Sequence, residues 1–286
     1  MSAALASLST IAVVVFAISS MLSVGLALSW RQIAARLSHA RGVVRALVAN
    51  FVLVPLLVYI VLEIFTLERP LGIGLFLVAS AAGAPFLVKL TEAAESDMPL
   101  AATLLVLLLP VTIVYMPLVV PLVLPQAEVS AAMIAQPLVL TMLLPLAIGL
   151  TIRERAEQWA ARLQPPLARL ATIALVVLIA ATVLANLPAI QSIFRTAAIL
   201  ATFILLGGAF IIGYLLGGRQ RRAREVLALG TAQRNIAAAT VVASQAVHDP
   251  AVVAMVIVSS FIGFVILFPA AAVMRRRRQA REVAAH

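Results

Sequence analysis

The length, composition and charge of this chain place it in a membrane. It has 286 residues, of which 64% are hydrophobic and 11% charged, and its mean hydropathy is +1.13. A soluble domain has about 25% charged residues and cannot hide this much apolar surface, which excludes a soluble enzyme, a disordered chain and a nucleic-acid-binding module. The absence of cysteine excludes disulfides, iron–sulfur clusters and thiolate zinc sites. The net charge of +10 is therefore typical of basic loops between membrane spans.

The apolar residues fall into stretches of membrane-spanning length. A bilayer core about 30 Å thick takes roughly 20 apolar residues per helix. Because the linkers are short, the sequence predicts an all-α polytopic membrane protein with a single transmembrane domain over residues 1–286. The nine expected spans are 8–30, 43–65, 70–91, 98–124, 129–152, 167–188, 194–217, 225–247 and 250–274.

The basic residues set the expected orientation of these spans. All of the 21 Lys and Arg residues fall on one side of the bundle except Arg69, Arg195 and Arg234. The positive-inside rule then places the N-terminus outside and the C-terminus in the cytoplasm. The expected location is therefore the cell (inner, cytoplasmic) membrane. Residues 275–286 are expected to form a basic cytoplasmic tail, in which Arg275–Arg278 flank the last span.

The third stretch contains Gly83 and Pro85 near its middle. Proline removes a backbone donor and clashes with the preceding turn, so we expect the helix to break here. The freed backbone groups must then be buried in protein or face a watery cavity. Two interpretations of the charged residues that follow stay open: a functional site on one helical face, or a charged cytoplasmic hairpin between spans. These residues are Lys89, Glu92, Glu95 and Asp97.

The eighth stretch carries Arg234 about ten residues inside a predicted span. A guanidinium stays charged at any accessible pH and cannot face lipid at this depth, so it must meet an acceptor across the bundle. The residue is either part of a substrate or coupling site, or a structural arginine tied to helix-end carbonyls. The spacing of Thr231, Arg234 and Asn235 predicts a shared helical face. The candidate binding residues here are Gly230, Thr231, Gln233, Arg234 and Asn235.

The third and eighth stretches share one layout, in which a polar interruption containing glycine separates two apolar halves. The two stretches are five span positions apart, and an odd separation gives them opposite orientations in the membrane. Interrupted helices at corresponding places of two inverted halves indicate a secondary-transporter site. The halves are expected at 1–152 and 153–286. In span two, Asn50 is either a further cavity residue or a helix-packing amide.

The segments Ala49-Asn-Phe-Val-Leu-Val-Pro55 and Gly230-Thr-Ala-Gln-Arg-Asn-Ile-Ala-Ala-Ala239, with the nine-span layout, resemble the bile acid:sodium symporter family. The resemblance covers nearly the whole chain. It implies a panel domain and a core domain, an inverted repeat, and two broken helices that cross in the core. Those helices would be spans three and eight.

The resemblance also implies positions for the family's sodium ligands. A Ser-Asn pair of the first broken helix falls on Leu87 and Val88, and the glutamate shared by both sodium sites falls on Gly230. Two glutamines fall on Arg234 and Asn50. Of these positions, only Asn50 keeps the chemical type of ligand that a hard cation prefers, so the sequence predicts that the sodium-site residues are altered in this chain.

The expected function is a secondary transporter of a small organic anion that works by alternating access. Arg234, together with Lys89, would serve as a built-in cation that binds the anion or pairs with Glu92, Glu95 or Asp97 in a proton-linked switch. Na⁺ or H⁺ is the candidate coupling ion, no cofactor is expected, and the expected partners are the substrate anion and the lipid bilayer, with no nucleic acid.

Two other functions fit the same sequence. One is sodium-coupled symport through rearranged ligands, and the other is a non-transporting membrane sensor or scaffold. No enzyme is expected, because no Ser/His/Asp, Cys/His or paired-carboxylate set lies at membrane depth with both an acid and a base.

Overall fold

The computed structural model describes residues 2–29, 40–123, 130–185, 191, 193 and 196–284, and every regular element within them is helical. Among these described residues, eight helical segments are long and apolar enough to cross a bilayer, and a further apolar helix is shorter. The chain is thus a multi-pass membrane protein. The α-helices are α1 (Ser2–Ala27), α3 (Ala40–Val48), α4 (Val54–Ile64), α5 (Arg69–Ser80), α6 (Leu87–Ala93), α7 (Met98–Val123), α8 (Ala131–Leu138), α9 (Leu144–Arg155), α10 (Glu157–Ala185), α12 (Ala198–Leu216), α13 (Arg221–Ala232), α14 (Ile236–Val242) and α15 (Pro250–Ala284). Single π-helical turns lie at Ala49–Leu53, Val139–Leu143 and Ala243–Val247.

The expected third span is divided into two short helices, α5 and α6, with non-helical backbone at 81–86. Gly83 has φ +74°, and a Cβ atom there would lie 2.6 Å from the backbone nitrogen of Leu109 in α7. Only glycine combines this backbone conformation with so close an approach. The interruption therefore lies where Gly83 and Pro85 predict it. The nine-crossing topology itself stays a prediction.

The expected eighth span is also interrupted. Helix α13 ends at Ala232, α14 begins at Ile236, and the residues between them are not helical. The Asn235 side chain caps α14, because its Oδ1 accepts a hydrogen bond from the Ala238 backbone nitrogen at 3.1 Å. The prediction that Thr231, Arg234 and Asn235 share one helical face is wrong, because the helix ends before the second and third of them.

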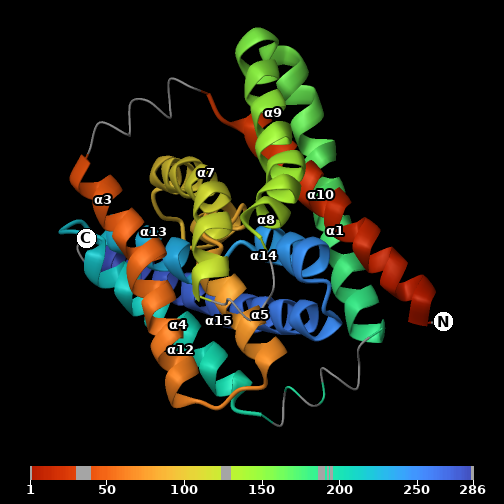
Figure 1. The fold of residues 1–286 in the computed structure, drawn as a ribbon. Helices are drawn as coiled ribbons and strands as arrows, with labels where there is room; N and C mark the ends of the chain where they lie inside the picture. The colour runs from red at the N-terminus through yellow and green to blue at the C-terminus, as the bar shows by residue number, and fades with distance from the viewer. Residues whose placement is uncertain are drawn as a thin grey trace.

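The helices form two groups that meet at the interrupted segments. Helix α1 packs along α9 and α10 (Figure 1), while α4, α5, α12, α13 and α15 pack among themselves. In the first group, Gly25 of α1 and Gly149 of α9 allow a close approach: a Cβ atom on Gly25 would lie 2.4 Å from the Leu146 carbonyl oxygen. The two groups touch where α15 contacts α10, and α14, which packs against α5 and α15, also contacts α1.

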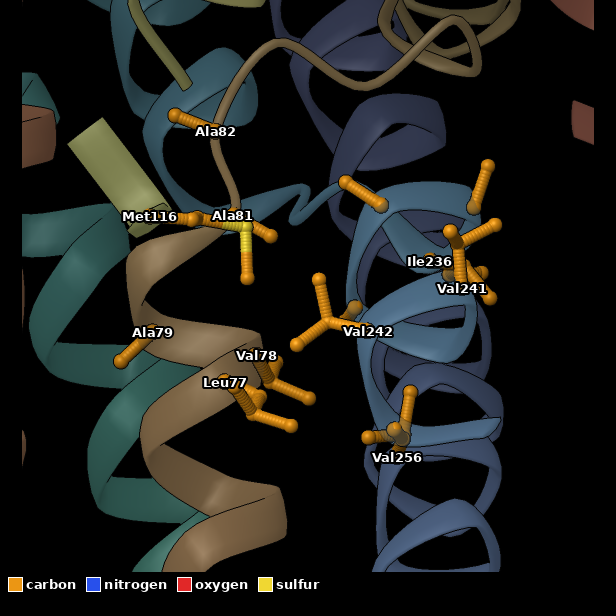
Figure 2. Packing of buried hydrophobic residues seen from close by; sticks show 14 of the residues in the cluster. Leu77, Val78, Ala79, Ala81, Ala82, Met116, Ile236, Val241, Val242 and Val256 are labelled. Atoms are coloured by element: carbon orange, nitrogen blue, oxygen red, sulfur yellow. The ribbon is translucent and has the colours of Figure 1, made fainter. Parts of the chain in front are cut away.

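Buried aliphatic side chains hold the interrupted helices against each other. Figure 2 shows Val242 of α14 facing Leu77 and Val78 of α5. On the outside, large apolar side chains such as Ile173 of α10 and Ile211 of α12 are exposed. In a bilayer these side chains contact lipid, and the helical backbone satisfies its own hydrogen bonds.

The basic C-terminal region is not a separate tail. Helix α15 continues through it as far as Ala284. Within the described residues, the segment expected as a basic cytoplasmic tail at 275–286 is the last part of a long helix, and its cytoplasmic location stays a prediction. From this part of α15, the Arg278 side chain contacts Glu225 and the Glu95 carbonyl oxygen.

Candidate functional site

The two interruptions contact each other directly. The Asn235 backbone nitrogen donates a hydrogen bond to the Ala81 carbonyl oxygen at 2.8 Å, and Asn235 Nδ2 donates to the Gly83 carbonyl oxygen at 3.1 Å. From α7, Thr112 Oγ1 accepts from the Ala82 nitrogen and donates to the Ala82 oxygen, each at 3.0 Å. Backbone groups freed by the first break are thus satisfied inside the protein, as membrane depth requires.

The guanidinium of Arg234 lies within this crossing, and the residue is only 4% exposed. Its Nε donates to the Val78 carbonyl oxygen at 3.2 Å. Nη1 donates to Asn50 Oδ1 at 2.9 Å and to the Thr231 carbonyl oxygen at 3.0 Å. Nη2 donates to the carbonyl oxygens of Ala79 and, at 3.5 Å, Asn50. A guanidinium has five N–H groups, so all of them have an acceptor in the protein.

These acceptors explain how a charge is held here without a carboxylate. Val78 and Ala79 lie in the last turn of α5, and Thr231 lies in the last turn of α13. The C-terminal end of a helix carries about half a negative charge, so two such ends converge on one positive side chain. None of its partners among the described residues is acidic. Arg234 therefore does not pair with Glu92, Glu95 or Asp97 in this structure, and a proton-linked switch between them stays a prediction.

Asn50 connects span two to the crossing. Its π-helical turn lies between α3 and α4, and its side chain is fully buried. Besides accepting from Arg234, it donates from Nδ2 to the Ala46 carbonyl oxygen at 3.0 Å and to Thr231 Oγ1 at 3.3 Å. Asn50, Thr231 and Arg234 thus form one hydrogen-bonded set.

The other predicted site residues of the eighth stretch lie close by. Gln233 is buried in the interruption. Gly230 packs against α6, because a Cβ atom there would lie 3.0 Å from Leu87 Cδ2. A larger residue at this position would push against the second half of the first interrupted helix. A role of these residues in binding substrate or ion stays a prediction.

The charged residues after the first interruption do not join the crossing. Lys89 and Glu92 form an ion pair at 3.3 Å, with side chains 68% and 63% exposed. Asp97 precedes α7 and accepts a hydrogen bond from the Leu100 nitrogen at 3.0 Å. Glu95 lies beyond the end of α6, so the expected single face of Lys89, Glu92 and Glu95 is wrong. Of the two interpretations of these charged residues, the positions of Glu92 and Glu95 fit a charged hairpin between spans better than a functional site on one helical face.

The residues at the crossing do not fit a sodium ion. A hard cation needs several oxygen ligands, and the carbonyl oxygens of α5 and α13 together with Asn50 Oδ1 already accept from Arg234. Leu87, Val88 and Gly230 bring no side-chain oxygen. The guanidinium therefore donates hydrogen bonds to the carbonyl oxygens at the ends of the interrupted helices, which a bound cation would need as ligands.

A cavity of about 160 Å³ lies between the two groups of helices, bounded by α1, α10 and the segment from Pro85 to Lys89. Phe16, Val24 and Phe86 contribute apolar walls. Across it, Gln164 Nε2 donates to Ser23 Oγ at 3.3 Å, which links α10 to α1. The polar lining residues are Ser20, Ser23, Lys89, Gln164 and Thr172.

Sequence reasoning missed a second buried charge, Glu225 of α13, which is 3% exposed. Its Oε1 accepts from Arg221 Nε at 2.9 Å, and its Oε2 accepts from Arg278 Nη2 at 2.9 Å and from Ser96 Oγ at 3.4 Å. Arg278 also donates to the Glu95 carbonyl oxygen. The sequence offered one indication of this cluster, which was an acidic residue at the start of an apolar run. The pairing itself could not be predicted, because Arg278 on α15 is distant in sequence from Glu225.

Comparison with known proteins identifies a family. A family model described as the Sodium Bile acid symporter family matches residues 12–193, more than half of the chain. The matched range includes Asn50 and the first interruption, and it ends before the second. No curated protein matches this chain.

Proposed function

This chain belongs to the Sodium Bile acid symporter family, and on that premise we propose that it carries a small organic anion across the membrane with Arg234 as a fixed cation. Membership implies a sodium-coupled secondary transporter, and the members of the family are transporters rather than enzymes. The proposal for this chain differs in one respect: the guanidinium replaces a bound cation, so transport proceeds without a sodium gradient.

The observation that carries this proposal is the complete use of the Arg234 donors. In transporters with interrupted helices, the C-terminal ends of half-helices coordinate the coupling cation. Here the corresponding oxygens of α5 and α13 accept from one side chain. Since every N–H group of Arg234 is engaged, the substrate makes no hydrogen bond to it, and Arg234 acts through its charge and by holding the crossing together.

The substrate contacts are proposed for the cavity between α1, α10 and the segment from Pro85 to Lys89. Its volume of about 160 Å³ suits a small anion, since pockets for drug-sized ligands are about 300–1,000 Å³. Lys89 supplies a positive charge at its edge, and Ser20, Gln164 and Thr172 supply polar groups.

The cavity lies where a movement between two bodies would open and close it. We take α1, α9 and α10 as the panel and the interrupted helices with their neighbours as the core. Rocking of one group against the other then exposes the cavity alternately to the two sides. The positive-inside rule supports the N-terminus outside, the C-terminus in the cytoplasm, and a location in the cell membrane.

The test is uptake into proteoliposomes of a panel of labelled small mono- and dicarboxylates, with taurocholate included. Each is measured with a sodium gradient and with sodium replaced by choline. We expect uptake of a small carboxylate at equal rates in both conditions, and loss of uptake in Arg234→Gln. Uptake that requires sodium, with Arg234→Gln still active, would overturn the proposal and favour symport through rearranged ligands.

A further inference from the structure

A second cavity lies away from the crossing, on the far side of the interrupted helices from α1 and α10. It has a volume of about 370 Å³ and lies between α3, α7, the end of α12 and the start of α13. None of its lining residues contributes to the crossing or to the cavity beside Lys89. The proposed transport mechanism therefore leaves it without a role.

Its lining is divided into an apolar and a charged part. Leucines from three helices form the apolar walls, namely Leu100, Leu104, Leu107, Leu216 and Leu227. The charged residues are Arg45 of α3 and Asp97 before α7. An apolar wall with charged groups on one part of its lining fits an amphiphilic molecule better than a small hydrophilic one.

The two charged residues line the same cavity without forming an ion pair with each other. Among the described residues, neither has an oppositely charged partner. Asp97 uses Oδ1 to cap α7, by accepting from the Leu100 nitrogen at 3.0 Å, and no described residue donates a hydrogen bond to its second oxygen. Arg45 is exposed, with Nη1 beside the backbone of Gly218.

Two neighbouring arginines are engaged elsewhere. Arg224 donates from Nε to the Gly218 carbonyl oxygen at 2.7 Å and lies over the Tyr214 ring at 5.5 Å. Arg221 pairs with Glu225. The cavity thus presents one available cation and one available carboxylate, a combination that matches a ligand with both charges.

We propose that this cavity binds a membrane lipid whose headgroup joins a phosphate to a primary ammonium, as in phosphatidylethanolamine. The phosphate contacts Arg45, the ammonium contacts Asp97, and the acyl chains begin along the leucine wall. Basic pockets between membrane helices recognise lipid headgroups in this way, and the carboxylate adds selection for a headgroup that also carries a positive charge. The site goes beyond the transport function and does not depend on it.

The test is native mass spectrometry of the full chain, purified in detergent and given equal amounts of phosphatidylethanolamine and phosphatidylglycerol with identical acyl chains. We expect about a tenfold preference for phosphatidylethanolamine, the ratio that one charge-assisted hydrogen bond supplies. Asp97→Asn keeps an N-cap residue and removes the charge, so it should abolish the preference while binding continues. Arg45→Gln should reduce binding of both lipids.

Two further variants keep the test decisive. Arg41→Gln removes an exposed arginine of α3 that does not line the cavity, and it should change nothing. Gly42→Leu adds an apolar side chain to the cavity lining, where a Cβ atom meets nothing within 4 Å, and it should weaken binding of both lipids with the charges intact. Equal binding of the two lipids by the wild type would overturn the proposal. So would unchanged binding in Arg45→Gln and Gly42→Leu, or displacement of the lipid by free phosphoethanolamine at equal concentration.

Discussion

Arg234 and Glu225 are the two charged residues buried in the described part of the chain, and the protein holds them in opposite ways. Arg234 has no acidic partner and is surrounded by carbonyl oxygens and an amide. Glu225 receives two guanidinium groups and a hydroxyl. The first arrangement leaves a positive charge without a counter-charge, while the second pairs the buried carboxylate with positive charges. A charge that is retained at membrane depth without neutralisation is a functional hypothesis by default, whereas a neutralised one is explained by structure.

The partners of Glu225 show what that second arrangement connects. Ser96 lies between α6 and α7, Arg221 begins α13, and Arg278 is near the end of α15. The cluster therefore ties together the ends of both interrupted helices and the last helix. It holds the half-helices in place at one end, while Arg234 holds them at their crossing.

The largest effect is expected when Arg234 is removed. Arg234→Ala removes the donor of five hydrogen bonds at the crossing, and each buried group left unsatisfied costs about 1–3 kcal/mol. We expect this variant to lose a monodisperse peak in size-exclusion chromatography of the detergent-solubilised protein. Arg234→Lys keeps the charge with three donors in place of five, and it should fold with a lower thermal midpoint. An alanine variant as heat-stable as the wild type would show that the contacts at the crossing contribute little.

The second-largest effect is expected when Arg234 is given the acidic partner that it lacks. Asn50→Asp places a carboxylate against Arg234 Nη1, which converts the crossing into an arrangement like that of Glu225. If the uncompensated charge is what the transporter uses, this variant should fold and lose about tenfold or more in uptake rate, the ratio that corresponds to 1.4 kcal/mol. The measurement is proteoliposome uptake, with size-exclusion chromatography as the control for folding. Full activity in Asn50→Asp would argue that the net charge at the crossing has no role.

A moderate effect is expected at the other buried charge. Glu225→Gln and Arg278→Gln should each lower the thermal midpoint, and the double variant should lower it little further, because the two residues share one interaction. Arg221 is partly exposed, so part of this loss should disappear in about 1 M salt, where the screening length falls to about 3 Å. Effects of Arg234 variants should not depend on salt. Strict additivity of the two substitutions would contradict the cluster.

The smallest effect on stability is expected at Lys89. Its ion pair with Glu92 is exposed, and such pairs contribute about 0.2–1 kcal/mol. Lys89→Gln should therefore leave the thermal midpoint nearly unchanged. If Lys89 faces the substrate anion, the KM for uptake should rise in Lys89→Gln while kcat stays the same. A stability loss comparable to that of Glu225→Gln would mean that Lys89 has a structural partner.

Features that depend on local chemistry could be predicted from the sequence. Gly83 and Pro85 located the first interruption, because a positive φ and a missing backbone donor act within a few residues of themselves. Arg234 required an acceptor across the bundle, because a charge at membrane depth has no other way to be satisfied. The apolar stretches and the family resemblance follow from composition and from short motifs in the same way.

Features that depend on contacts between distant segments could not be predicted. The pairing of Glu225 with Arg278 joins residues on different helices, and the basic cluster on α15 resembles the flank of any last span. The helical spacing of Thr231, Arg234 and Asn235 predicted a shared face, yet the chain leaves the helix between them so that Asn235 caps α14. Which carbonyl groups accept from Arg234 is likewise set by how α5 and α13 converge.

The central claim is that the guanidinium of Arg234 takes the place of a bound sodium ion. The most direct test is the thermal midpoint of the purified protein, measured while sodium replaces choline at constant ionic strength, since a ligand that binds the folded state raises its stability. We predict no sodium-specific shift for the wild type at any concentration up to that of a physiological gradient. A saturable rise in the midpoint with sodium, with no such rise in potassium, would contradict the claim.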